Sequence, residues 1–394
     1  MTRFEPFRAI HYDLDTFDPA AVTAPPYDVI SPDDRAVLCD RSPANVVRID
    51  LPVDGDDPYA DAAALFARWQ ADGVLVTDDE PSFIVYRMEA PDEDGVLRRT
   101  TGVIGAMELS RPGEGDILPH EFTTPKARSD RLDLLRSTRA NLSAVWGLSP
   151  ATGLTDLLST TDDPLCRFEA DGVVHTLWRI TESGRVDAIR AAVAAHPIVI
   201  ADGHHRYETS LAYRDERRVA DGHGGAADAV MTFVVELVDD ELFVAPFHRL
   251  LSDLPDDIDL LVAFEPFFEI EPFESDGTAT VRAMQQAGAL ALLRTDGAWL
   301  LRPRPGAMDG VRDLDSSRLD RALASLPDHT LQFQHGVDHA RAAVERGEAQ
   351  AAVLLRPVGV DQIIAIADGG ERMPPKSTFF FPKPRTGLVF RSID

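Results

Sequence analysis

A short apolar run that leads through a glycine turn into a helical stretch constrains the fold of this chain most strongly. Residues 198–200 are branched and apolar, as in a buried strand, and Asp202 and Gly203 form a turn signal. From His204 the sequence continues with helical spacing through Leu211. A strand, a glycine turn and a helix start direct backbone N–H groups to one point, where the helix dipole favours an anion. The segment therefore predicts a strand–helix unit of a mixed α/β fold with an anion site at its turn.

The residues at the start of this helix carry side chains that suit an anion site. His204, His205 and Arg206 follow the turn directly, so a phosphate or a carboxylate is the expected ligand. The plain alternative is a turn in which Asp202 caps the helix and both histidines lie on the surface. Two adjacent histidines cannot share one helix face, so at least one of them is not a simple core residue. We favour the anion site.

Lysine is scarce, and the positions where it occurs are informative. Of 39 lysine and arginine residues only three are lysine: Lys126, Lys376 and Lys383. All three lie in motif-like segments that contain proline and threonine or serine. An ammonium is a compact point charge with three donors, whereas a guanidinium is a planar fork. We therefore expect the lysines at positions where a guanidinium cannot replace an ammonium. The alternative is that they were retained by chance on the surface.

Length and charge limit the classes of protein to which the chain can belong. Its 394 residues suffice for two or three domains, or for one large core with insertions. The net charge of −27 makes duplex nucleic acid a poor partner, because binding it requires a basic face. No run approaches the ~20 apolar residues of a membrane span, and the first residues lack the apolar core of a signal peptide. We expect a cytoplasmic protein with no membrane partner.

The two cysteines, Cys39 and Cys166, do not indicate a metal or disulfide framework. Neither has CxxC spacing, which excludes a zinc ribbon and a disulfide scaffold. Cys39 lies in a helix-like run without an adjacent histidine, so we interpret it as a small buried residue.

Alternating strand and helix patterns organise the chain into two expected regions. An Asp- and Pro-rich stretch at 251–259 predicts a boundary, with a mixed α/β core over 1–255 and an α+β region over 256–394. The 376–378 segment of the second region is expected to pack back on the core. Local patterns predict a strand over 43–50 and two hairpins, one formed by 82–89 and 99–109 and the other by 229–238 and 241–246.

Charged and hydroxyl side chains gather in motifs that lie far apart in the sequence. Together they supply the acids, bases, cations and hydroxyls that hold phosphates, neutralise charge and deprotonate a hydroxyl. Neither a Walker A pattern nor G-x-G-x-x-G occurs, so a conventional P-loop or Rossmann nucleotide site is excluded. The candidate site residues outside 202–208 are Tyr27, Asp28, His120, Glu121, Thr123, Lys126, Arg131, His248, Arg249, Lys376, Ser377, Thr378 and Lys383.

A transition metal bound by the protein is a competing interpretation. His204 and Glu208 have i, i+4 spacing, and His120, His205 and His248 could join them as ligands. The H-E-x-x-H pattern is absent, however, and the adjacent His-Glu pair does not easily reach one metal. Magnesium that enters with a nucleotide fits better, since it needs only one or two carboxylates together with phosphate oxygens.

Several separated segments together carry a family resemblance. One is the Ala-Asp-Gly-His-His-Arg-Tyr-Glu turn, and the others are residues 25–30, 120–123, 130–132, 248–249, 373–383 and 386–388. Taken in chain order, from the first residues to the last, these segments resemble a family of uncharacterised bacterial and archaeal proteins, the domain-of-unknown-function 1015 (DUF1015) family. This resemblance implies no particular activity.

The Asp-Gly-His-His-Arg turn is also similar to the phosphate-binding turn of the ParB/sulfiredoxin-like superfamily, which includes nucleotide hydrolases, a sulfinic acid reductase and free-serine kinases. In that superfamily the turn lies at the start of a helix and binds nucleotide phosphates. The similarity implies an α/β (mixed α+β) fold, with a ParB/sulfiredoxin-like core, large insertions and a C-terminal α+β region. The catalytic cysteine of sulfiredoxin would fall at His204 or His205, so reductase chemistry is not expected.

These features predict an enzyme that binds nucleotide phosphate, either a small-molecule phosphotransferase or a nucleotide hydrolase, with Mg²⁺ entering with the nucleotide. Lys126 or Lys383 would neutralise developing charge. The alternatives are a non-enzymatic nucleotide sensor and a metal-dependent hydrolase that uses His120, His204 and Glu208. The expected bases or magnesium ligands are Glu121, Asp202 and Glu208. The expected phosphate ligands are Gly203, His204, His205, Arg206, Lys376, Ser377 and Thr378.

Overall fold

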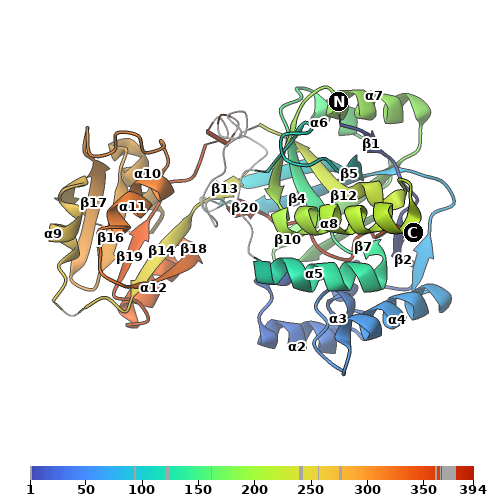
Figure 1. The fold of residues 1–394 in the computed structure, drawn as a ribbon, viewed down its shortest axis with the longest axis horizontal. Coiled ribbons are helices and arrows are strands. Elements are labelled where there is room, and N and C mark those ends of the chain that lie inside the picture. Colours follow the sequence, from blue (N-terminus) through green and yellow to red (C-terminus); the bar gives the residue numbers. More distant parts are fainter. Residues whose placement is uncertain are drawn as a thin grey trace.

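The computed structural model describes residues 2–92, 95–119, 125–160, 162–238, 243–255, 257–274, 277–359, 362–363, 365 and 379–394. The described chain is a mixed α/β structure whose two largest sheets have nine and six strands (Figure 1). The expected mixed α/β class is confirmed, whereas the ParB/sulfiredoxin-like core stays a prediction. None of the helices in these ranges combines the length and the apolar character needed to cross a bilayer.

The nine-stranded sheet forms the larger core. Its strands are β1 (Phe4–Glu5), β4 (Phe83–Pro91), β5 (Leu97–Glu108), β6 (Ile117–Pro119), β8 (Val145–Ser149), β9 (Cys166–Ala170), β10 (Val173–Ile180), β11 (Ile198–Asp202) and β12 (Ala229–Glu236). Their order is β6-β11-β8-β12-β5-β4-β10-β9, with β1 added to β5. The β6–β11 and β8–β12 pairs are parallel, and the other pairs are antiparallel.

The central strand β12 shows why this sheet is covered on both faces. Side chains alternate between the two faces of a strand. Met231, Phe233 and Val235 accordingly join one apolar cluster, while Val230 and Val234 join the other. A strand that is buried on both faces appears in the sequence as a continuous apolar run, as β12 does.

Helices cover this sheet and build the layers beside it. They are α1 (Pro19–Val22), α2 (Pro32–Arg41), α3 (Val47–Asp50), α4 (Pro58–Ala71), α5 (Pro125–Thr138), α6 (Leu154–Leu158), α7 (Ser183–Ala194) and α8 (His204–Asp221), with 3-10 turns at η1 (Tyr27–Val29) and η2 (Ala226–Asp228). Ile189 of α7 and Tyr207 of α8 pack into the same face of the sheet. Helix α5 contacts both α8 and α4, and in Figure 1 it lies between α8 and the group α2–α4.

The six-stranded sheet has its own helices. Its strands are β14 (Phe247–Ser252), β15 (Phe268–Pro272), β16 (Leu290–Arg294), β17 (Gly297–Pro303), β18 (Thr330–His335) and β19 (Ala351–Leu354), in the order β15-β17-β16-β19-β14-β18. Helices α9 (Leu260–Phe264) and α11 (Asp315–Leu323) pack on one face, and α10 (Gly277–Ala287) and α12 (Val337–Glu345) on the other. Strand β14 precedes residue 255, so this sheet draws on both sides of the expected boundary. The domain division stays a prediction.

The last described residues pack back against the core of the larger sheet. Strand β20 (Phe379–Phe381) pairs with β13 (Phe243–Ala245), and β21 (Arg391–Ser392) pairs with β7 (Ala140–Asn141). Between them, Thr386 forms a bridge with Ala24. This return brings the C-terminal segment to the helices that surround the start of α8.

Two local predictions are confirmed and two are wrong. The strand–turn–helix unit at 198–208 is β11 and α8, and the hairpin over 82–109 is the antiparallel pair β4–β5. The strand expected over 43–50 is absent, and its last four residues form α3. Strand β12 pairs with β5 and β8, and β13 pairs with β20, so the second hairpin does not form. An apolar run does not specify which partner it pairs with, because tertiary packing decides that.

Candidate functional site

The turn between β11 and α8 is built around Gly203. Its φ of +86° lies in the left-handed region, which glycine adopts without strain. A β-carbon at this position would lie 3.0 Å from the guanidinium of Arg206, so the side chain of Arg206 folds back over the turn. As the N-cap residue, Gly203 offers no side chain to the first-turn N–H groups, which have no acceptor within the helix. The start of α8 therefore has no side-chain cap from Gly203, and the anion site expected there stays a prediction.

Asp202 forms ion pairs with two cationic side chains at this turn. Arg206 Nη2 donates to one carboxylate oxygen at 2.6 Å, and Lys383 Nζ donates to the other. Arg206 also donates to the carbonyl of Ala144. Burial alone would raise the pKa of Asp202, but Lys383 and Arg206 outweigh it and hold that pKa well below the usual range. Asp202 is therefore ionised at neutral pH.

The other predicted residues of the turn lie on the first turns of α8. His204 is buried, and its charged form would also lower the pKa of Asp202. His205 and Glu208 are partly exposed. The structure thus places these residues beside Asp202, and their role in a site stays a prediction.

A second cluster adjoins the turn and is centred on Arg131 of α5. The buried Arg131 guanidinium stacks on the ring of Tyr27 at 4.1 Å. It donates to the carbonyl of Asp50 at 2.6 Å and to the carboxylate of Asp130 at 2.8 Å. Asp28, beside Tyr27, is exposed. Arg131 therefore ties η1, α3 and α5 together.

Charges couple this cluster to the turn. Burial raises the pKa of Asp50 above its ordinary value, and Arg131 and then Arg206 offset part of that rise. Burial likewise raises the pKa of Tyr27 to about 12, although Arg206 and Arg131 act in the opposite direction. Arg206 thus acts on Asp202, Asp50 and Tyr27, and the two clusters form one electrostatic site.

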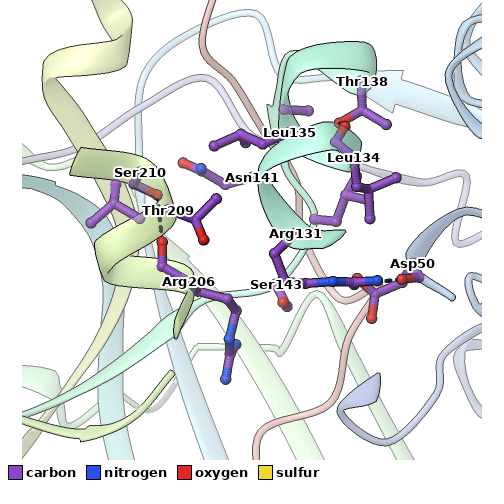
Figure 2. Close-up of a pocket in the computed structure, with 13 residues that line it drawn as sticks. Asp50, Arg131, Leu134, Leu135, Thr138, Asn141, Ser143, Arg206, Thr209 and Ser210 are labelled. Carbon is purple, nitrogen blue, oxygen red and sulfur yellow. Dashed lines mark hydrogen bonds and ion pairs between the residues drawn. The ribbon is translucent and has the colours of Figure 1, made fainter. Parts of the chain in front are cut away.

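A cavity of about 50 Å³ lies between α5 and α8 at this site (Figure 2). Thr209 is 2% exposed and lines the cavity, and among the described residues its hydroxyl oxygen has no hydrogen-bond partner. The hydroxyl of Ser210, by contrast, donates to the carbonyl of Arg206 at 2.8 Å. The polar lining residues are Asp50, Arg131, Thr138, Asn141, Ser143, Arg206, Thr209 and Ser210.

Two predicted site residues lie in the six-stranded sheet instead. His248 accepts a hydrogen bond from the Leu355 N–H at 3.2 Å, and burial, with Arg249 and His335, lowers its pKa to about 3. Arg249 donates to the Phe247 carbonyl and stacks on the ring of Phe333 at 4.4 Å. These partners belong to β14, β18 and the chain after β19, and not to the Asp202 turn. A role of either residue in the site stays a prediction.

Several predicted residues lie outside the part of the chain that the structure describes. Lys126 is in the first turn of α5, but its side chain is not among those described. Across the described side chains, no group of three or more His, Cys, Asp or Glu could hold a metal ion. The expected metal set is therefore not tested as a whole, since one of its three members is undescribed. The residues outside the description are His120, Glu121, Thr123, Lys376, Ser377 and Thr378.

Sequence reasoning missed two residues of the site, Asp50 and Thr209. Asp50 ends an apolar segment that resembles a strand, so nothing marked it as polar lining of a cavity. Thr209 lies three positions after Arg206, about one helical turn further on, and that spacing could have identified it.

Comparison with known proteins assigns the chain to a family but to no activity. The family model described as "Protein of unknown function (DUF1015)" matches residues 4–320, which confirms the resemblance expected from the motifs. No curated protein matches the chain.

Three similar solved structures have low TM-scores, which establish neither a shared fold nor a shared ligand. A conserved hypothetical protein from Pyrococcus furiosus is 13% identical, over 70% of this chain and 90% of that chain, with a TM-score of 0.36. A free serine kinase in complex with AMP is 10% identical, over 69% and 88%, with a TM-score of 0.38. SbnI with a C-terminal truncation, from Staphylococcus aureus, is 11% identical, over 70% and 84%, with a TM-score of 0.38. The similarity to the ParB/sulfiredoxin-like superfamily stays a prediction.

Proposed function

The chain belongs to this family of proteins of unknown function, and we propose that it binds the phosphate chain of a nucleotide at the start of α8 and transfers a phosphoryl group to a small molecule. One observation carries the proposal. Arg206 and Lys383, which lie far apart in the chain, meet on Asp202 at a helix start that Gly203 opens. Two cations and a helix N-terminus directed at one point favour a multiply charged oxyanion.

Each residue of the turn has a role in this proposal. The first N–H groups of α8, Arg206 and Lys383 hold phosphate oxygens and offset the charge that develops during transfer. Asp202 fixes both cations, and its lowered pKa makes it a weak base but a suitable anionic ligand for Mg²⁺ that enters with the nucleotide. Lys126, Lys376, Ser377 and Thr378 are further candidates for phosphate contacts.

Incubation of the protein with Mg²⁺ and ATP, ADP or CTP, followed by ³¹P NMR, tests the proposal. We expect line broadening of the nucleotide that binds and new phosphate signals as it turns over. Broadening without turnover would support the sensor alternative. Sharp and unchanged spectra for all three nucleotides would contradict nucleotide binding.

A further inference from the structure

The cavity between α5 and α8 adjoins the proposed phosphate site and has a polar lining of its own. We infer that it binds the hydroxyl-bearing end of a small acceptor molecule, and that Asp50 is the base that removes the hydroxyl proton. This inference rests on the proposed phosphoryl transfer and identifies the second substrate as an alcohol.

The size of the cavity sets the size of the group that it can hold. Its volume is about 50 Å³, and one water molecule requires roughly 10–15 Å³ of such space. There is room for a few non-hydrogen atoms, which corresponds to a hydroxymethyl or hydroxyethyl end and not to a nucleoside. The cavity is therefore suited to an acceptor group, with the nucleotide bound outside it.

Among the described residues, the buried carboxylate of Asp50 has one hydrogen-bond donor, Arg131, and that donor is distant. Asp50 is 4% exposed and lines the cavity. Nη1 of Arg131 lies 3.5 Å from its carboxylate oxygen, which is long for a charge-assisted bond of ~2.7–2.9 Å, whereas the same nitrogen donates at 2.6 Å to the Asp50 carbonyl. By comparison, Asp130 accepts from both Arg131 and Tyr59 at 2.8 and 2.7 Å. Asp50 thus retains capacity to accept a hydrogen bond from a ligand.

Thr209 supplies an independent observation on the opposite wall. Its hydroxyl oxygen is buried, and among the described residues it has no hydrogen-bond partner. Buried hydroxyls almost always have a partner, from the protein or from a bound molecule. Figure 2 shows the Thr209 side chain between α8 and α5, beside Arg206. A ligand with two polar atoms could accept from Thr209 with one of them and donate its hydroxyl proton to Asp50 with the other.

The charges of the neighbouring groups single out Asp50 as the base. Burial raises its pKa, whereas Lys383 and Arg206 lower that of Asp202, and Tyr59 and Arg131 offset the effect of burial and lower that of Asp130. A carboxylate with a raised pKa is a stronger proton acceptor near neutral pH. Arg206 lines the same cavity and binds Asp202, so it would place the phosphate next to the acceptor.

The reaction step balances without a further reactant. Asp50 takes the hydroxyl proton, and the acceptor oxygen forms a bond to the terminal phosphorus of the nucleotide. The bond from that phosphorus to the bridging oxygen breaks, and the shortened nucleotide leaves with the electron pair. Arg206 and Lys383 offset the charge on the leaving oxygen. The proton then passes from Asp50 to water.

The test uses ethylene glycol as the hydroxyl probe and ATP or ADP with Mg²⁺ as donor, on the full chain. In Asp50→Asn we expect nucleotide affinity within about threefold of the wild type. The rate of transfer to ethylene glycol should fall by at least ~100-fold. The wild-type rate should rise with pH as Asp50 loses its proton, and this rise should vanish in the variant. Asp54→Asn removes an exposed carboxylate outside the site and should change neither property.

Asp50→Asn with the wild-type rate and pH profile would overturn the inference. If that variant does not fold, Thr209→Val tests the hydroxyl site instead. We expect a higher KM for ethylene glycol in Thr209→Val and the wild-type KM in Thr209→Ser. An unchanged KM in Thr209→Val overturns the hydroxyl site.

Failure of the proposed function has a different signature, because the wild type would then bind neither ATP nor ADP. In that event a crystal soaked in ethylene glycol tests the cavity by itself. A glycol molecule with one hydroxyl bonded to Asp50 and the other to Thr209 would support the hydroxyl site. A cavity without glycol would overturn it.

Discussion

The ammonium of Lys383 reaches a carboxylate that lies 181 positions earlier in the chain, at Asp202. Arg206 occupies the other oxygen of the same carboxylate, so each oxygen has one cation. Lys383 is one of only three lysines, and the scarcity of the residue type predicted a position where an ammonium is needed. The contact with Asp202 supplies a physical reason for that need. A second guanidinium is larger and planar, so it would not take the place of the compact ammonium beside Arg206.

We predict that Lys383→Arg impairs nucleotide turnover nearly as much as Lys383→Ala. The longer fork would displace its charge by an ångström or more, and a misplacement of that size costs on the order of 100-fold in rate. Turnover is measured beside a melting curve, with Arg217→Lys, a change at a partly exposed position on α8, as the matched control. Wild-type turnover and melting in Lys383→Arg would mean that the lysine persisted by chance.

The residues of the site differ in how well the sequence predicted them. Gly203 and Arg206 were predictable because their roles depend on a local turn and on the first turn of one helix. Asp50 was not, because the apolar Val47 and Ile49 before it are equally compatible with a strand and with a buried helix. Its importance appears only when α3 packs beside Arg131, which lies 81 positions away.

At the scale of secondary-structure elements, each of the two large sheets contains one buried histidine. His175 lies in β10 of the nine-stranded sheet and His248 in β14 of the six-stranded sheet. Burial lowers the pKa of each to about 3; Arg385 adds to this effect at His175, and Arg249 and His335 add to it at His248. Both imidazoles are therefore neutral in the folded protein at neutral pH.

We predict that mild acid destabilises the protein through these two histidines. An unfolded histidine has a pKa of about 6.5, so below that pH protons bind the unfolded chain first. The free energy of unfolding then falls by about 1.4 kcal/mol per pH unit for each histidine until the pH reaches the folded value near 3. Between pH 7 and 5 the loss is roughly 2 kcal/mol for each.

Denaturant unfolding at pH 7 and pH 5 measures this loss. His175→Gln and His248→Gln should each lose roughly 2 kcal/mol less than the wild type on acidification, whereas the exposed His223→Gln should behave as the wild type does. Equal acid losses in all three variants would contradict the assignment.

The elements also show where sequence patterns stop being sufficient. The β11–α8 unit and the β4–β5 hairpin follow from local signals, and both were predicted. The pairing of β12 with β5 and β8 depends on which apolar strands meet in the core, and the hairpin expected there was wrong. Strand registers of this kind are decided by packing between distant segments.

At the scale of the whole molecule, the site depends on segments from both ends of the chain. The described residues after 378 return to pair with β13 and β7, and Lys383 lies on this return. Tyr27, Asp50 and Arg131 come from the first third of the chain, and the α8 turn lies near its middle. The motifs predicted that such distant segments matter, but only the folded chain shows which side chains meet.

Nucleotide binding by Arg206→Ala, measured by titration calorimetry, tests the central claim most directly. Arg206 makes the charge-assisted contacts at the turn, so its loss should weaken binding by about 1.5–3 kcal/mol while the melting curve stays that of a folded protein. Arg111→Ala, which removes an exposed arginine paired with Asp215 on α8, is the matched control and should bind as the wild type does. If Arg206→Ala binds ATP, ADP and CTP as tightly as the wild type, the start of α8 is not the phosphate site.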